Sequence, residues 1–81
     1  MPMSLFSRIT LLLTHLNSLR KRQQQLDHEL VTARRQMIPN AQLVHWLEVR
    51  RLMVSEQIYR HTEILQNLKA ALQHGSARKV A

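Results

Sequence analysis

The sequence contains no cysteine, only one glycine and only two prolines among its 81 residues. The absence of cysteine excludes a disulfide framework and any metal site built on thiolates. So little glycine and proline leaves few residues that favour turns, and no stretch alternates apolar and polar residues as a half-buried strand would. These absences count against β-rich and disulfide-stabilised folds and favour long helices.

Long hydrophobic runs are also missing. The longest strictly apolar run near the start is Leu11-Leu12-Leu13, which is far too short for a membrane span or for the core of a secretory signal. We therefore expect a cytoplasmic protein that does not insert into a membrane. A chain of 81 residues forms one domain at most, and such a small domain is marginally stable unless its helices are long or a partner completes its core.

Negative charge is scarce, because twelve lysines and arginines stand against five aspartates and glutamates. This balance is compatible with a nucleic acid, an anionic membrane or an acidic protein as partner, and equally with an Arg-rich helix face in solvent. The basic residues form three clusters, Arg20-Lys21-Arg22, Arg34-Arg35 and Arg50-Arg51. Consecutive helical residues point about 100° apart, so each cluster spreads its charge around the helix instead of forming one phosphate-binding face. The pattern also fits poorly with a helix lying on a membrane.

Apolar residues in the first half recur at alternating steps of three and four, which predicts a helix over residues 5–37 with a heptad seam. Ser4 is suited to cap its start, and Gln23 is the one polar member of the repeat. The apolar or small members of this seam are Ile9, Leu12, Leu16, Leu19, Leu26, Leu30, Ala33 and Met37.

The second half repeats the same spacing and predicts a helix over residues 41–73, with Arg51 and His61 at its two polar seam positions. Gly75 is a natural stop, since glycine tolerates the left-handed conformation that ends many helices. Residues 76–81 carry no seam residue and are expected to form a flexible basic tail. The apolar seam members are Val44, Leu47, Val54, Ile58, Leu65, Leu68 and Leu72.

Pro39 interrupts the chain between the two patterns. It disfavours helical geometry at Ile38 and lacks the amide that a continuing helix needs, while Asn40 can cap a new helix. A turn over residues 38–40 makes the two helices antiparallel neighbours. The predicted fold is therefore all-α, a coiled-coil-like two-helix antiparallel hairpin over residues 1–75, with a single bent helix as the alternative.

Antiparallel pairing around Pro39 predicts specific neighbours across the two helices. Arg50 and Arg51 should lie near Asp27 and Glu29. The other expected contacts place Glu56 near Arg22 and Gln23, and His61 near Leu19.

The second helix carries more apolar residues than one seam can bury. Trp46, Val49, Met53 and Ile64 form a second stripe, rotated by roughly 100° from the seam on a helical wheel. Leu52 and Tyr59 lie on yet another side, and the first helix adds Phe6, Leu13 and Val31. These residues predict an exposed surface that binds a helical protein or a second copy of the chain. Helix curvature that tucks part of the stripe inside is the alternative.

Catalytic and metal-binding patterns are not found in this sequence. No two of the five histidines stand four residues apart, as a helical zinc pair would, and no Gly-rich phosphate loop or nucleophile elbow occurs. A two-helix chain also offers little room for a pocket. We expect a non-enzymatic protein with no cofactor and no metal.

The stretch AQLVHWLEVRRLMVSEQIYRHTEIL, residues 41–65, follows a Gln- and Arg-rich first helix and a short break. This layout resembles the small helical-hairpin co-chaperones of bacterial type III secretion needle subunits, over residues 5–72. The present chain departs from them in being strongly basic. The positions that carry the resemblance are Gln42, Trp46, Leu52, Ser55, Ile58, Tyr59 and His61.

The resemblance implies a hairpin that pairs with a helical-repeat chaperone and helps it keep the needle subunit soluble before export. By analogy, the face with Trp46, Val49, Met53 and Ile64 would dock on that chaperone. Two other functions remain compatible with the sequence. One is a structural module in which two hairpins form a four-helix bundle, and the other is a small basic nucleic-acid-binding accessory protein.

Overall fold

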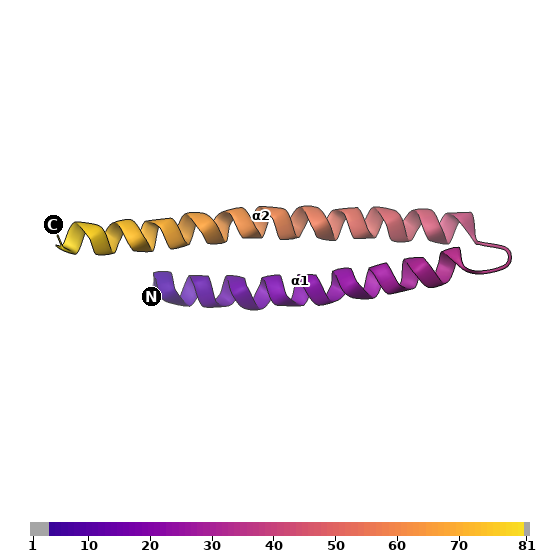
Figure 1. Ribbon diagram of the computed structural model, residues 1–81, viewed down its shortest axis with the longest axis horizontal. Helices are drawn as coiled ribbons and strands as arrows, with labels where there is room; N and C mark the ends of the chain where they lie inside the picture. Colours follow the sequence, from indigo (N-terminus) through magenta and orange to yellow (C-terminus); the bar gives the residue numbers. More distant parts are fainter. Residues whose placement is uncertain (1–3, 81) are drawn as a thin grey trace.

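The computed structural model describes the backbone of residues 4–80 and the side chains of residues 4–74. It consists of two helices, α1 (Leu5–Arg34) and α2 (Ala41–Val80). They lie side by side, run in opposite directions and are joined by residues 35–40 (Figure 1). The protein is thus an all-α antiparallel hairpin, as predicted, and not a single bent helix. Its extents of 66 × 22 × 15 Å are those of one layer of two helices, and no third element of the described residues covers either side of the pair.

Polar side chains cap the start of both helices. The Ser4 hydroxyl accepts a hydrogen bond of 3.1 Å from the Ser7 amide. The Asn40 side-chain oxygen accepts from the amides of Gln42 and Leu43, at 3.1 and 3.2 Å. These bonds satisfy amides that have no partner within the first helical turn, which explains why α2 starts directly after Asn40.

Replacing Asn40 with alanine is expected to lower the free energy of unfolding by about 1 kcal/mol, because the two amides lose their acceptor. Asn40→Asp is the matched control, since its carboxylate accepts the same bonds and suits the positive end of the helix dipole. Urea denaturation followed by circular dichroism measures both. Equal losses in the two variants would contradict the capping role.

The turn is longer than the sequence predicts, because α1 ends at Arg34 and not at residue 37. The Arg35 amide still donates to the Val31 carbonyl at 3.1 Å, and the helix then opens. None of the described residues has a positive φ, so the chain cannot reverse through a tight left-handed turn and needs more residues. Met37 and Ile38 are consequently fully exposed, and the prediction that Met37 belongs to the seam is wrong.

The other end of the hairpin also differs from the prediction, since α2 passes through Gly75 and continues to Val80. One glycine in a helix costs only about 1 kcal/mol relative to alanine, and the residues after it include good helix formers and no proline. The backbone of residues 76–80 therefore continues the helix and does not form the separate tail that we predicted. Ala81 lies outside the described residues.

The core follows the predicted seam in two clusters. Near the turn, Leu19, Leu26, Leu30, Ala33, Leu47 and Val54 are buried, with Val44 and Ile58 packed against them. Towards the open end, Ile9, Leu16 and Leu65 are buried, and the partly buried residues around them are Leu5, Leu12, Ile58 and Leu68.

Besides Met37, the predicted seam residue Leu72 also remains exposed, at 43%. Leu65 packs in the same cluster as Ile9. Leu72 lies one heptad after Leu65 on α2. Because the helices are antiparallel, its partner on the first helix would lie one heptad before Ile9, at residue 2, but α1 begins only at Leu5. Since α2 has 40 residues and α1 has 30, α2 extends past the start of α1, as Figure 1 shows, and Leu72 has no seam to pack against.

Three polar contacts cross between the helices. Arg51 forms the expected ion pair with Asp27, and Arg34 pairs with Glu48 at 2.8 Å. The Gln23 amide donates to the Ser55 hydroxyl at 2.9 Å. Both ion pairs are about half exposed, so each contributes roughly 0 to 1 kcal/mol. The seam supplies most of the stability.

Three other residues of the predicted pairs, Arg50, Gln23 and His61, form contacts with further partners. Arg50 lies over the Trp46 ring, 5.4 Å from its centroid, and forms no ion pair with Glu29. The cross-helix hydrogen bond of Gln23 goes to Ser55, next to Glu56 in the sequence, and the His61 ring packs on His15. Long side chains reach several neighbours from one backbone position, so the pairing of helices alone does not select among them.

Candidate protein-binding surface

The two long edges of the hairpin, on either side of the seam, differ in chemistry. We call one of them the polar flank, because it carries every hydrogen bond and ion pair that joins the two helices among the described side chains. It consists of Asp27, Arg34, Glu48 and Ser55, each directly after a seam position, and of the two polar seam residues that bind them, Gln23 and Arg51. The polar groups of this flank therefore bind one another.

The opposite edge has no such contact between its described side chains. We call it the Trp46 face, and its residues line three adjacent shallow grooves between the helices. They are Leu43, Trp46, Arg50, Met53 and Ile64 on α2, and Leu11, His15, Arg22 and Glu29 on α1. Five of them are large apolar side chains that remain substantially exposed: Leu11, Leu43, Trp46, Met53 and Ile64.

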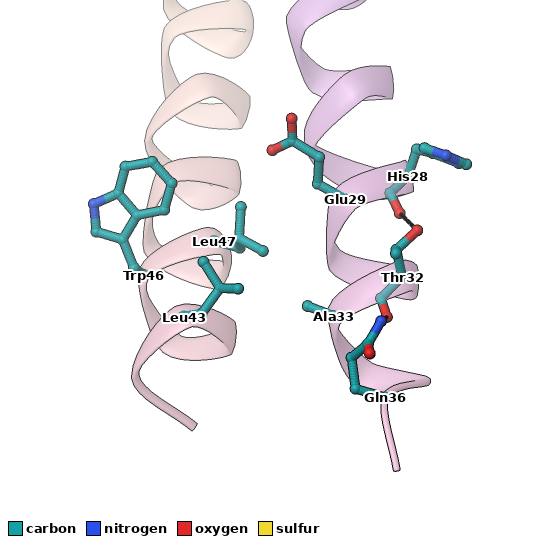
Figure 2. A pocket seen from close by; sticks show the side chains of 8 residues that line it. All are labelled: His28, Glu29, Thr32, Ala33, Gln36, Leu43, Trp46 and Leu47. Atoms are coloured by element: carbon teal, nitrogen blue, oxygen red, sulfur yellow. Dashed lines mark hydrogen bonds between the residues drawn. The ribbon is translucent and has the colours of Figure 1, made fainter. Parts of the chain in front are cut away.

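The groove nearest the turn has a volume of about 490 Å³ and is mostly apolar. Leu43 and Leu47 of α2 face Ala33 of α1 across it, and the Glu29 carboxylate is directed towards α2, while the Trp46 ring lies on the side of α2 away from α1 (Figure 2). Trp46 is 53% exposed. A side chain with this much exposed aromatic surface is the kind of residue that anchors protein interfaces.

Two polar side chains beside this groove, from Thr32 of α1 and Gln36 of the connection, bind carbonyl groups of α1. The Thr32 hydroxyl donates to the His28 carbonyl at 3.0 Å, and the Gln36 amide donates to the Thr32 carbonyl at 3.3 Å. His28 and Thr32 point away from α2 in Figure 2. The side of the groove that faces α2 is thus formed by apolar groups and Glu29.

The middle of the Trp46 face is basic. Arg22 of α1 and Arg50 of α2 line the same small groove, together with Met53 and Gln57. Neither arginine belongs to the ion pairs of the described residues. The contact of Arg50 with Trp46 is a cation–π interaction, which leaves its guanidinium donors available to an acceptor.

The open end of the face is apolar again, around two imidazole rings that contact each other at an angle. A groove of about 420 Å³ is lined by Leu11, Leu12, Ile64 and Leu68 together with His15 and His61. The two rings have centroids 4.7 Å apart and are tilted by 56°. His61 Nδ1 lies 2.6 Å from the Gln57 carbonyl. Because a carbonyl only accepts, this nitrogen is the donor, and the ring is held in place.

The six predicted partner-binding residues do not share one surface. Trp46, Met53 and Ile64 lie on the Trp46 face, and exposed Val49 lies behind it, one helical turn from Trp46 and Met53. Leu52 lies on the opposite side, in a groove with Glu48, Arg51 and Ser55 of the polar flank. The stripe and the Leu52–Tyr59 pair are therefore separate, as the helical wheel predicts.

Tyr59 is one heptad after Leu52 and is exposed. A hydrogen bond to Glu63, together with the negative charge of that carboxylate, raises the pKa of the Tyr59 phenol above its usual value. Tyr59 thus interacts with a residue of its own helix. Trp46, by contrast, lines the groove nearest the turn.

Several residues of the Trp46 face were not singled out from the sequence, although a simple signal marks them. Each stands directly before a seam position: Leu43 before Val44 and Arg50 before Arg51 on α2, and His15 before Leu16 and Arg22 before Gln23 on α1. In an antiparallel pair, the positions on the same side of both seams meet along one edge. Comparing the positions before the seam on both helices therefore identifies the residues of this edge.

Among the side chains of residues 4–74, no three His, Asp or Glu residues come close enough together to hold a metal ion. Within the described chain, neither helix combines the length and the apolar character that crossing a bilayer requires. No known protein family, curated protein or solved structure matches this chain in sequence or fold.

Proposed function

We propose that this chain is a non-enzymatic protein-binding subunit that docks on a helical partner through its Trp46 face. The observation that carries this proposal is the exposure of five large apolar side chains along one edge of a hairpin whose seam is already closed. Within residues 4–80, which form a single layer, no further element covers them. Burying such side chains gains roughly 1.5–3 kcal/mol each, so a partner that covers the face stabilises the hairpin.

The specific role that we propose is that of a type III secretion co-chaperone acting in the cytoplasm. The hairpin would pair with a helical-repeat chaperone, and together they would keep the needle subunit soluble before export. Support comes from the resemblance of residues 5–72 to such co-chaperones and from the antiparallel arrangement of the two helices. Of the residues that carry the resemblance, Trp46 lies on the exposed face and Ile58 packs in the core.

Affinity purification of the tagged full chain from its native host, with identification of bound proteins by mass spectrometry, tests this role. The expected result is an equimolar complex with a helical-repeat chaperone, in which the needle subunit is also found. Recovery of a homodimer without such a chaperone would contradict the proposal and favour a four-helix bundle. Recovery of nucleic acid as the main partner would contradict it as well.

A further inference from the structure

We infer that the segment seated on the Trp46 face is an acidic amphipathic helix of the partner, apolar at both ends and carboxylate-rich in its middle. This inference rests on the docking face of the proposed function and adds the chemistry of its occupant. It follows from the order of surfaces along the face: an apolar groove at Trp46, a basic centre at Arg22 and Arg50, and an apolar groove at Ile64.

The length of the face matches a helix. Trp46 and Ile64 are eighteen residues apart on α2, which is roughly 27 Å at about 1.5 Å per residue. A partner helix of about five turns spans the same distance. Its apolar ends would fill the two outer grooves, while its middle turns would lie over the arginines.

The charge of the face favours an acidic occupant. The three grooves are lined by Arg8, Arg22 and Arg50, against the single carboxylate of Glu29. On the polar flank, by contrast, Arg34 and Arg51 are neutralised by Glu48 and Asp27. Carboxylates of a docked helix would supply for Arg22 and Arg50 the counter-charges that the hairpin itself does not provide.

A second copy of this chain fits the same face poorly. Arg22 lies midway along the face on α1, seven residues from His15 in one outer groove and seven residues from Glu29 in the other. Two copies packed face to face around a two-fold axis at that midpoint would bring their Arg22 side chains together. Like charges pressed together at the centre of an interface oppose binding. A nucleic acid could bind the arginines through its phosphates, but it would leave the apolar grooves at both ends uncovered, because phosphates form no favourable contacts with apolar side chains.

Three synthetic peptides of about 20 residues, long enough for five turns, test the inference with the intact chain. They share leucines at both ends and differ only in the middle, which carries glutamate, glutamine or lysine. Fluorescence anisotropy of the labelled peptides gives their affinities. We expect the glutamate peptide to bind about tenfold more tightly than the glutamine peptide, and the lysine peptide to bind most weakly.

A pair of double variants locates the effect. Arg22→Gln with Arg50→Gln should bring the glutamate and glutamine peptides to within about twofold of each other, because the central charges are gone. Arg20→Gln with Lys21→Gln removes the same net charge outside the face and should keep the preference of about tenfold. Circular dichroism should show that both variants remain helical, since these side chains lie outside the buried core.

The outcomes separate this inference from the proposed function. If Trp46→Ala weakens all three peptides and none is preferred, the docking face stands and the acidic occupant is wrong. If Trp46→Ala leaves every peptide unaffected, the docking face itself is wrong. If both double variants lose the preference equally, the preference comes from the net charge of the chain and not from Arg22 and Arg50. If duplex DNA binds more strongly than the glutamate peptide, the arginines bind nucleic acid and the inference is wrong.

Discussion

Leu16→Ala is expected to remove most of the stability of the isolated hairpin. Leu16 is the most deeply buried large side chain, at 1% exposure, and it packs with Ile9 and Leu65 at the open end. Truncating a buried leucine costs about 2–5 kcal/mol, because apolar contacts are lost and a cavity remains. A chain of this size rarely has more than about 3–5 kcal/mol in total. The variant should therefore lose most of its helical circular dichroism signal at room temperature.

Leu13→Ala is the matched control for Leu16→Ala. Leu13 lies three residues earlier in the same helix but is exposed, and the change of residue type and helix propensity is identical. Its free energy of unfolding should change by no more than about 0.5 kcal/mol. Similar losses in both variants, measured by urea denaturation, would show that the seam around Leu16 is not what holds the helices together.

Trp46→Ala is expected to have the largest effect on binding. An aromatic anchor of a protein interface typically contributes about 2–4 kcal/mol, which corresponds to a loss of roughly 30- to 1000-fold in affinity. The helical signal of the free hairpin should stay nearly unchanged, because Trp46 is exposed and lies outside both buried clusters. Calorimetric titration against the chaperone recovered with the wild-type chain measures the affinity.

Tyr59→Ala provides the comparison for Trp46→Ala. Tyr59 is also an exposed aromatic residue of α2, but it interacts with Glu63 and lies one heptad after Leu52, on the other side of the helix. Its removal should change the affinity by less than about threefold, as is usual for residues outside the anchor. Comparable losses for Tyr59→Ala and Trp46→Ala would mean that the partner wraps around α2 and does not select the Trp46 face.

The seam could be predicted from the sequence because it is a property of spacing alone. Apolar residues three and four apart lie on one side of a helix whatever the helix packs against. Pro39 and Asn40 predicted where the chain turns back, because their effects on the helix ends are also local. The ends were harder to predict. The end of α1 at Arg34 depends on the path of the turn, and the exposure of Leu72 depends on how far α1 reaches beside α2.

The candidate site was predicted only in part. The stripe of Trp46, Met53 and Ile64 is visible on one helical wheel, and the structure brings all three to one edge. The contributions of Leu11 and Arg22 from α1 come into view only once the two helices are paired. The stacking of His15 on His61 and the contact of Arg50 with Trp46 depend on side-chain conformation, which spacing does not fix.

The single tryptophan reports directly on whether the hairpin keeps this face open for another protein. The measurement is the fluorescence emission of Trp46 in the isolated chain over a range of concentrations, with sedimentation velocity on the same samples. The prediction is a monomer whose indole emits as in water and is quenched readily by acrylamide, with a shift to shorter wavelength only when the partner is added. A blue-shifted, quencher-protected indole in the isolated chain, whether in a monomer or in a homodimer, would contradict it.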